Sequence, residues 1–528
     1  MQTQDDLFLR LEQLNDIGAS LSSERNIKLL LERIVLAAKQ ITRADGGTLY
    51  LLSEDRRHLH FEIVRTDSLR LTFGGASEQP TSGKFPDLPL YLGDGAPNDR
   101  MVAAYAAIAG KTVNIADAYS AEGFDFSGTR QFDARTGYRS QSFLTVPMKD
   151  HEGEIIGVLQ LINALSPADG AVSEFSQADQ RLAESLASQA AIALSNRQLV
   201  EQLEALFESF VKLINLAIDE KSPYTGGHCQ RVPELTMMLA EAADAATEGP
   251  LADFKLTDKD RYELRIAALL HDCGKVTTPV HIVDKATKLQ TIYDRIDLID
   301  TRFEVVKRDA EIHKWKRLAE GVNPTEAERE YVDFCQKIQV DRSILHHANI
   351  GCENMADEVI ADVRRIATEY RWRNADGEEL PFLSADELEN LTIRSGTLTR
   401  AERDIINHHI VATIKMLEQL PWPRHLKNVP EYAGGHHERM DGNGYPKGLK
   451  REGMSWQARI MGIADIFEAL TAKDRPYKEG MKLSEALAIL ERFSLNGHID
   501  PALHEVFVGS EVFRSYASAF LKAHQIDC

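Results

Sequence analysis

The residues best suited to chemistry form one short run, His271-Asp272-Cys273-Gly274-Lys275, which sets an imidazole beside a carboxylate. The run follows an apolar stretch, residues 262–270, that has the 3.6-residue period of a helix. One metal ion lying beyond the helix end can be bound by both side chains, and the carboxylate keeps a second oxygen for another ion. Gly274 is expected to allow a sharp backbone turn, and Lys275 to place a positive charge near a bound anion. A solvent-exposed His-Asp pair is the alternative interpretation.

Five more histidine or aspartate residues, which could bind the same metal ions, lie before and after this run in the carboxyl-terminal half. In chain order they are His228, His409, His436, His437 and Asp465. Seven imidazole and carboxylate groups without a thiolate suit iron, manganese, zinc or nickel, and argue against a structural cysteine-zinc site. Each histidine taken alone could be a surface residue. Asp465, however, lies among apolar neighbours, where an unpaired carboxylate is costly.

Four other histidines are expected to lie outside this site. His408 is expected to be structural, because it neighbours His409 but points off its helix face. His313, His346 and His347 fall in a charged segment and are expected to be solvated.

Composition bounds the class of protein. With 528 residues the chain is too long for one core, so two to four domains are expected. A net charge of −20 argues against binding duplex nucleic acid, although bound metal ions would still allow a small anionic ligand. No apolar stretch reaches the ~18 residues of a membrane helix, and residues 1–6 are too polar for a secretory signal. Five scattered cysteines suit a reducing cytoplasm, so a cytoplasmic protein without a membrane span is predicted.

The amino-terminal part predicts an α+β domain over residues 1–175. Residues 7–43 have a helical pattern, with Ser23 as a candidate cap, and a second helix is expected at 100–109. Alternating apolar residues predict four strands, at 48–52, 59–64, 142–148 and 154–163. Residues 66–100 form a long loop rich in Gly, Pro and Asp. Gly153 supplies the positive φ that the turn at 150–153 needs.

Residues 136–148 and 157–163 of this domain resemble a GAF domain, and the resemblance covers about residues 10–195. It implies a sensor module that binds a small molecule. The subset that binds cyclic nucleotides carries an Asn-Lys, Phe, Asp-Glu signature after the last strand. This chain has Asn163-Ala164, Phe175 and Asp179-Gln180, so two of the five positions depart. Binding of an unidentified ligand, a cyclic nucleotide included, and a role in dimerisation alone both stay open.

Residues 176–220 predict one long, coiled-coil-like linker helix with two interleaved heptad series. One series is Leu186, Ala193, Val200, Phe207 and Ile214, and the other is Leu182, Gln189, Asn196, Leu203, Phe210 and Ala217. A sustained heptad is typical of a helix that pairs with a second copy. The sequence therefore favours a parallel homodimer whose linker carries a signal between domains. An amphipathic helix packed on its own domain is the alternative.

Residues 221–528 predict an all-α domain, and its motifs resemble an HD-GYP domain. They are His271-Asp272 with Lys275, Asp441 to Pro446 directly after His436-His437-Glu438, Ala464 to Leu470, and Arg475-Pro476-Tyr477. The resemblance covers residues 215–290 and 395–500. It implies an HD-type phosphohydrolase fold that hydrolyses cyclic di-GMP with two or three metal ions, often iron or manganese. The family pattern lacks a segment of about 292–394, which is expected to be helical and solvated, to modulate access and to carry no catalytic group.

The resemblance also implies a role for each residue. Asp272 would bridge two divalent transition-metal ions, with His228, His271 and Asp465 on one ion and His409, His436 and His437 on the other. Lys275 would stabilise charge on the phosphoryl oxygens. The remaining substrate contacts are expected from Gly444, Tyr445, Pro446, Arg475 and Lys478.

Linear pGpG is the expected product. Members with a third ion have a glutamate four residues before the first histidine ligand, and this chain has Tyr224 there. Two alternatives remain: a phosphodiesterase for another cyclic dinucleotide, such as 3′,3′-cyclic GMP-AMP, and a ligand-sensing interaction protein that acts through the Gly-Tyr-Pro loop.

Overall fold

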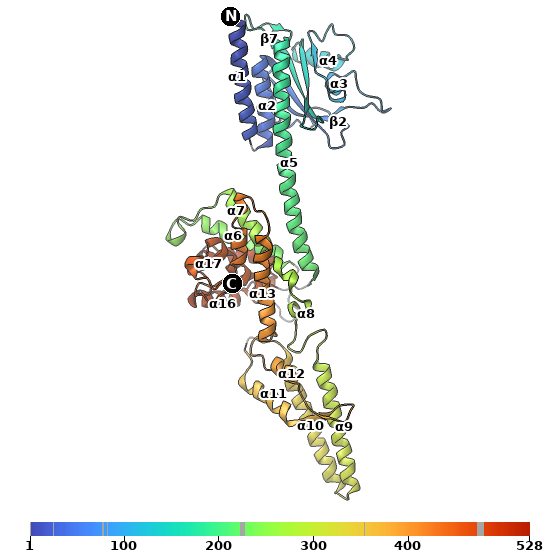
Figure 1. The fold of residues 1–528 in the computed structure, drawn as a ribbon, viewed down its shortest axis with the longest axis vertical. Coiled ribbons are helices and arrows are strands. Elements are labelled where there is room, and N and C mark those ends of the chain that lie inside the picture. Colours follow the sequence, from blue (N-terminus) through green and yellow to red (C-terminus); the bar gives the residue numbers. More distant parts are fainter. Residues whose placement is uncertain are drawn as a thin grey trace. The chain divides into compact units, whose positions relative to one another are not determined.

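A computed structural model describes the chain except for residues 1, 25, 77–78, 82, 222–226, 353 and 473–479, and describes side chains from residue 8 onward. It divides the protein into two compact units, Met1–Phe207 and Glu208–Cys528 (Figure 1). In the described part of the chain, no helix combines the length and the apolar character that a membrane span requires.

The first unit is built on one antiparallel sheet in the order β3-β2-β1-β7-β6-β5, with β4 paired to β2 and β8 paired to β7. The central strands, β1 and β7, pair along most of their length, from Ala44 opposite Ala164 to Leu51 opposite Gly157. The strands are β1 Ala44–Leu52, β2 His58–Thr66, β3 Leu71–Phe73, β4 Leu88–Pro89, β5 Val113–Ile115, β6 Phe143–Lys149, β7 Ile155–Leu165 and β8 Val172–Ser173.

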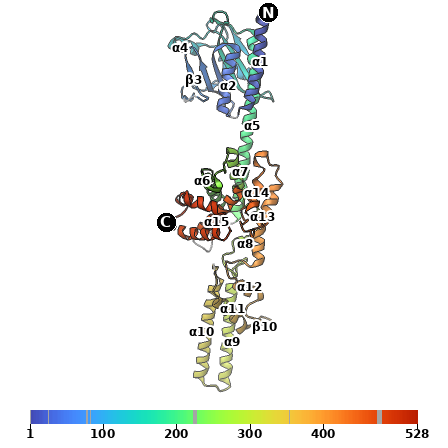
Figure 2. The same ribbon diagram turned by 90° about the vertical axis from the view of Figure 1, so that its left-hand side faces the viewer.

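Helices cover both faces of this sheet (Figures 1 and 2). On one face lie α1 Gln2–Ser23, α2 Ile27–Thr42 and the start of α5 Gln177–Lys221, and on the other lie α3 Val102–Ala109 and α4 Ser127–Thr136. The larger core joins Ile34 of α2, Leu159 of β7 and Leu186 of α5, all fully buried. These apolar residues recur along α2 and α5 at helical spacing, which is why both helices pack on the sheet.

The predicted α+β class is confirmed, with corrections at the amino terminus. Residues 7–43 are mainly helical, as predicted, and divide into α1 and α2, with Asn26 capping α2 by accepting from the backbone N–H of Lys28 and Leu29. Ser23, the predicted cap, is the last residue of α1. The four predicted strands correspond to β1, β2, β6 and β7, of which β6 and β7 begin one residue later than predicted. Gly153 has the expected positive φ, 84°.

The signature positions of the amino-terminal unit maintain its own structure. The Asn163 side chain accepts from the backbone N–H of Gln141, at 2.7 Å, and donates to the carbonyl of Arg139. Asp179 accepts from the backbone N–H of Ser176 and forms an ion pair with Arg10. These side chains are therefore occupied within the fold, and the ligand of this unit stays a prediction.

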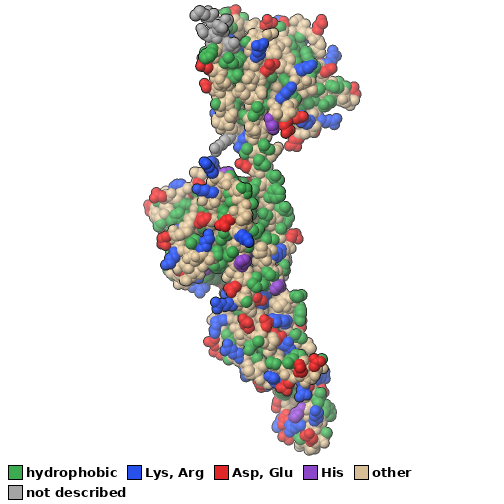
Figure 3. All heavy atoms as spheres, viewed as in Figure 1, with side chains coloured by type: hydrophobic (Ala, Val, Ile, Leu, Met, Phe, Trp, Pro, Cys, Tyr) green, Lys and Arg blue, Asp and Glu red, His purple; other side chains and the backbone are tan. Residues whose placement is uncertain are grey.

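The long helix α5 has two different halves. Leu182 and Leu186 are buried in the core of the first unit, so the expectation that they form part of a pairing surface is wrong. Further along, Leu203 and Phe210 are 55% and 56% exposed. Figure 3 shows hydrophobic side chains along this part of the helix. The heptad prediction therefore stands only for the second half, and stays a prediction there.

The second unit is helical, as predicted. Its principal helices outside the insertion are α6 His228–Asp244, α7 Asp258–Leu270, α13 Arg400–Glu418, α14 Val429–Gly434, α15 Trp456–Thr471, α16 Leu483–Leu495, α17 Pro501–Gly509 and α18 Val512–Phe520. Two shorter elements, η2 Cys273–Thr277 and α8 Val280–Val283, follow α7. The helix α6 packs against both α7 and α15, which brings distant sequence motifs together.

The insertion forms a helical subdomain with its own core. It contains α9 Ile296–Ala319, α10 Pro324–Asn349, α11 Asp357–Glu369, α12 Ala385–Leu391 and a hairpin of β9 Arg371–Arg373 with β10 Glu379–Pro381. Phe303, Leu345 and Phe382 are almost completely buried in that core. The helical prediction is confirmed. The expectation of a solvated segment holds for its surface only, because Phe303, Leu345 and Phe382 pack into a core of the segment's own.

Candidate metal centre

Five segments bring the seven predicted donor residues to one place in the second unit. His228 is the first residue of α6, His271 ends α7, and Asp272 leads directly into η2. His409 lies within α13 and Asp465 within α15, and His436-His437 follow α14. His271 is fully buried and Asp272 is 1% exposed, so the site is screened from bulk water.

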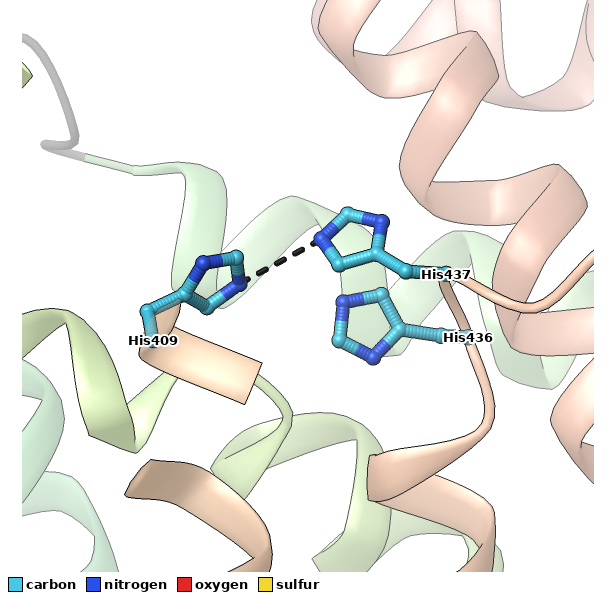
Figure 4. Close-up of side chains that lie close together, drawn as sticks. All are labelled: His409, His436 and His437. Carbon is cyan, nitrogen blue, oxygen red and sulfur yellow. Dashed lines mark hydrogen bonds between the residues drawn. The ribbon is translucent and has the colours of Figure 1, made fainter. Parts of the chain in front are cut away.

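The histidines and aspartates gather in two groups. In the first, the Nε2 atom of His228 lies 3.3 Å from that of His271 and 3.1 Å from Oδ2 of Asp272. In the second, Nε2 of His409 lies 3.3 Å from Nε2 of His437, and the centre of the His436 ring lies 4.1 Å from that of His437 (Figure 4). Within each group the donor atoms lie no more than 4.8 Å apart, a spacing at which three residues can hold one ion.

Both aspartates face both groups. Asp272 turns Oδ2 towards His271, at 3.2 Å, and Oδ1 towards Nε2 of His409, also at 3.2 Å. Asp465 turns Oδ1 towards His228, at 3.3 Å, and Oδ2 towards His437, at 3.9 Å. The sequence assigned Asp465 to the first group alone, whereas its second oxygen faces the other group.

Backbone carbonyls fix the orientation of three rings. The Nδ1 atoms of His271, His409 and His436 donate to the carbonyl oxygens three residues earlier, at 2.7, 2.6 and 2.6 Å. An imidazole that donates from Nδ1 presents a lone pair at Nε2, which is the tautomer that a metal ion requires.

Glu468 fixes the fourth ring, and sequence reasoning missed it. Its buried carboxylate accepts from Nδ1 of His228 and from Nε of Arg231, the latter at 2.7 Å. Glu468 lies one helical turn after Asp465 on α15, so the same helix supplies a donor to the site and the residue that orients another donor. Its spacing from Asp465 was the available signal.

Two buried atoms of the site have no hydrogen-bond partner, Oδ1 of Asp272 and Nε2 of His436. The contact of Oδ1 with His409 is not a hydrogen bond, because Nδ1 of His409 carries the proton and Nε2 offers a lone pair. Leaving such atoms unsatisfied costs about 1–3 kcal/mol each. A cation between them would satisfy both, so the residues present fit a metal ion.

Burial and charge set the protonation states. Burial lowers the pKa of His437 to about 4, and the pKa of His436 also lies well below its ordinary value. Burial opposes charge on His228 too, but the carboxylates of Glu468, Asp272 and Asp465 outweigh it and raise its pKa. Burial would raise the pKa of Asp272, yet Lys275 and the histidines hold it well below the usual range. Neutral imidazoles and ionised carboxylates are the forms that bind divalent transition metals.

Lys275 and Gly274 shape the wall beside Asp272. The Nζ atom of Lys275 lies 2.5 Å from Oδ2 of Asp272, and its side chain is 21% exposed. A Cβ at Gly274 would lie 2.0 Å from the carbonyl oxygen of His409. The backbone there continues into η2 without a positive φ, so the expected sharp turn is wrong. Gly274 instead allows η2 to approach α13 closely.

The Gly-Tyr-Pro loop lies against the second group. The ring of Tyr445 stacks on that of His437, with centroids 4.8 Å apart. Glu438 is buried and accepts from the backbone N–H of Lys447 and Leu449, at 2.7 and 2.8 Å, which fixes the loop. A Cβ at Gly444 would lie 2.4 Å from a backbone nitrogen, so only glycine fits. Pro446 is half-buried in the same loop.

Seven further residues were named from the sequence. Arg475, Lys478 and Tyr224 fall outside the described residues. His313, His347 and His408 are exposed, and His408 lies off the buried face that carries His409, as expected. His346 lies 2.9 Å from Asp300 in the insertion.

Comparisons with known proteins agree with this architecture. A GAF-domain family model matches residues 26–194, and two HD-domain family models match residues 225–340 and 340–503. The 3′3′-cGAMP-specific phosphodiesterase 3 of Vibrio cholerae is 26% identical over 298 residues, 56% of this chain and 38% of that protein. The 3′3′-cGAMP-specific phosphodiesterase 1 of the same organism is 44% identical over 80 residues, 15% of this chain and 18% of that protein.

A cyclic di-GMP phosphodiesterase of Pseudomonas aeruginosa is 36% identical over 115 residues, 22% of this chain and 27% of that protein. The chain therefore spans between 18% and 38% of the length of these three relatives. The sheet and its helices form the first matched domain, and the helical unit that carries the histidines forms the second. This chain joins an amino-terminal GAF domain to a carboxyl-terminal HD domain.

Proposed function

We propose that this chain is a metal-dependent cyclic dinucleotide phosphodiesterase that hydrolyses cyclic di-GMP to linear pGpG in bacterial second-messenger signalling, under control of the GAF domain. One observation carries the proposal: the two carboxylate oxygens of Asp272 face two separate groups of histidines. Enzymes that hydrolyse phosphodiesters with a pair of metal ions need such a shared ligand. The name of the Pseudomonas relative supports the substrate.

The donor residues divide between two ions in this proposal. His228 and His271 would hold the first, His409, His436 and His437 the second, and Asp272 and Asp465 have an oxygen directed to each. Bound divalent ions would lower the pKa of a water molecule and stabilise negative charge on the phosphoryl group. Iron or manganese suits this nitrogen and oxygen set best, and zinc or nickel is compatible with it.

Residues around the donors would bind the substrate. Lys275 remains protonated, because the Asp272 and Asp465 carboxylates outweigh its burial and raise its pKa. Its positive charge would stabilise a phosphoryl oxygen as negative charge develops there. The ring of Tyr445, held against His437, would provide a flat surface for a base or sugar.

The second candidate substrate is 3′,3′-cyclic GMP-AMP. It is favoured by the names of the two Vibrio relatives, one of which aligns over 298 residues. Both substrates offer the same phosphodiester to the same metal centre, so the proposed reaction is unchanged.

The product of the proposed reaction is the linear dinucleotide. A second cut requires the flexible linear product to be held again, which an extra ion would assist. Among the described residues near His228, Asp219 has a buried oxygen, Oδ1, without a hydrogen-bond partner, and burial raises its pKa. A raised pKa makes the ionised form of Asp219, which is the form that binds a metal ion, less favourable than it is for an exposed aspartate. A time course in which GMP forms as fast as pGpG, or three ions per chain, would contradict this product.

Chromatography of products separates these outcomes. The full chain, loaded anaerobically with iron or manganese, is incubated with cyclic di-GMP, cyclic di-AMP and 3′,3′-cyclic GMP-AMP. Hydrolysis of cyclic di-GMP supports the proposal, and exclusive hydrolysis of cyclic GMP-AMP supports the second candidate. A metal-loaded protein that cleaves none of them would refute both.

The neighbouring histidines on α13 provide a matched control. His409 is buried in the site, whereas His408 is exposed. His409→Ala should lose metal and turnover, and His408→Ala should keep both.

A further inference from the structure

We propose that the insertion binds a small amphipathic anion, an apolar or aromatic body that carries a carboxylate or sulfonate, between α9, α10 and β9. Two adjoining cavities of different character carry this inference. They lie in the insertion, apart from every donor residue of the metal centre.

The first cavity has a volume of about 550 Å³, and its lining combines apolar and aromatic side chains with charged ones, Lys314, Arg317, Glu330 and Glu369 among them. That volume lies within the range of ~300–1,000 Å³ that holds small organic ligands. Val306, Ala310 and Ala327 form aliphatic walls, and Tyr331, Phe334 and Tyr370 contribute aromatic ones. Such a lining favours an apolar or aromatic group over a purely polar metabolite.

The second cavity, of about 340 Å³, is mainly polar and shares Asp309, His313 and Arg371 with the first. It adds two more cationic residues, Lys316 and Arg373. Within the described residues, no ion pair joins Lys316, Arg373 or His313, and Arg371 has an exposed partner, Glu379, at 3.3 Å. Three permanent cations therefore face two carboxylates, Asp309 and Glu379, at this end.

The charge balance points to an anion. The whole chain has a net charge of −20, so a local excess of cations is opposite to the general trend. Figure 3 shows Lys and Arg side chains interspersed with Asp and Glu over the insertion. An anionic group beside Lys316 and Arg373 would neutralise this local excess of positive charge, while the attached body fills the apolar cavity.

The walls are held in place without a ligand. The hydroxyl of Tyr370 donates to Asp341, at 2.7 Å, and its ring packs on Phe303 and Phe382. Lys314 lies 4.4 Å from the centre of the Tyr331 ring and pairs with Glu328 at 3.0 Å. A cavity whose walls are fixed in advance binds with little loss of side-chain entropy.

The test uses 8-anilinonaphthalene-1-sulfonate, a fused aromatic body with one sulfonate, titrated into the full chain by fluorescence. One saturable site is expected. Lys316→Glu combined with Arg373→Glu should weaken binding by about tenfold or more, because repulsion replaces attraction. Ala310→Trp should abolish binding by filling the apolar cavity.

The control is Arg364→Glu, a single charge reversal of the same kind at an exposed residue of α11 outside both cavities. It should bind like the wild type. Metal content, measured in every variant, reports that the HD domain remains folded. Equal affinity of the double variant and the wild type would overturn the proposal. So would equal affinity for N-phenyl-1-naphthylamine, which has the same body without the sulfonate, because the cations would then contribute nothing.

Discussion

At the scale of the residue, Asp272 is notable because one of its carboxylate oxygens faces each group of histidines. Asp272→Ala removes an oxygen from each group, so most of the bound metal and more than about 99% of the turnover should be lost. Elemental analysis of the purified protein beside a turnover assay measures both. An active wild-type protein that contains no transition metal would contradict the prediction.

Glu468 should act on the metal through His228 rather than by contact. Glu468→Ala removes the acceptor that orients this ring and leaves the nearby Arg231 without it. Loss of a residue that orients a metal ligand through a hydrogen bond is expected to weaken metal affinity by about 10–100-fold. Competition with a chelator measures the affinity, and Glu485→Ala, at an exposed residue of α16, is the control. Unchanged affinity with intact folding would show that the ring is oriented by other contacts.

Metal binding should release protons from His228. Its pKa is raised, so in the metal-free protein this imidazole is protonated near neutral pH and must lose the proton at Nε2 to bind an ion. His437, with a pKa of about 4, is already neutral and releases none. Apparent affinity should therefore increase as pH rises from about 5.5 to 8, with roughly one proton released per chain at pH 7. Calorimetry in two buffers of different ionisation enthalpy measures this number, and a value of zero would reject it.

The stability of the metal-free protein should change with pH in the opposite direction to its metal affinity. A raised pKa in the folded state means that protonated His228 stabilises the metal-free fold below its unfolded pKa of ~6.5, and that this contribution is lost as pH rises through the folded value. Thermal unfolding of the metal-free protein from pH 6 upward should show the decline.

At the scale of the element, the insertion should be removable without loss of the metal centre. The chain enters and leaves it close together, because Thr397 donates from Oγ1 to the carbonyl of Lys285 at 2.9 Å. Replacing residues 286–396 with Gly-Ser-Gly should leave metal content unchanged and alter substrate access. Loss of metal from a variant with normal helical circular dichroism would contradict this, as would loss of metal in His346→Ala or His347→Ala.

That the seven candidate donor residues gather at one place could be predicted from the sequence, because their chemistry is visible in residue type. Asp465 lies among apolar neighbours and His436 adjoins His437, and a bound metal ion accounts directly for both features. Glu468 was missed, because a glutamate on a helix usually faces water and only its spacing from Asp465 pointed to the site. The close approach at Gly274 was equally hidden, since it depends on α13, more than a hundred residues later in the chain.

The heptad pattern of α5 was harder to interpret. A helix that packs on its own sheet and a helix that pairs with a second copy both repeat apolar residues at intervals of three and four. Only the burial of the side chains in the structure distinguishes the two kinds of helix. Leu186 is buried in the core, whereas Leu203 is exposed. In the insertion, the many charged residues suggested a solvated segment, and the core around Phe303 was not predicted.

At the scale of the whole molecule, the chain is predicted to be a homodimer through the second half of α5. Val200 and Leu203, 43% and 55% exposed, are large apolar residues that a partner helix would cover. Val200→Glu combined with Leu203→Glu should yield a monomer by light scattering at micromolar concentration. Gln202→Glu, an added charge at an exposed polar position between them, should remain dimeric. A wild-type monomer at that concentration would reject the prediction.

The pairing of His228 with Glu468 across 240 residues of sequence has a consequence for biosynthesis. At about 5–20 residues per second, roughly 12–48 s separate the synthesis of the two residues on the ribosome. During that interval His271 and Asp272 exist without the helix that contributes Asp465. The metal centre is therefore completed last, and a ribosome that stalls before α15 leaves a chain whose remaining donors cannot form the complete site. Under the proposed function, loading with two ions would therefore require translation to have passed Asp465 in α15.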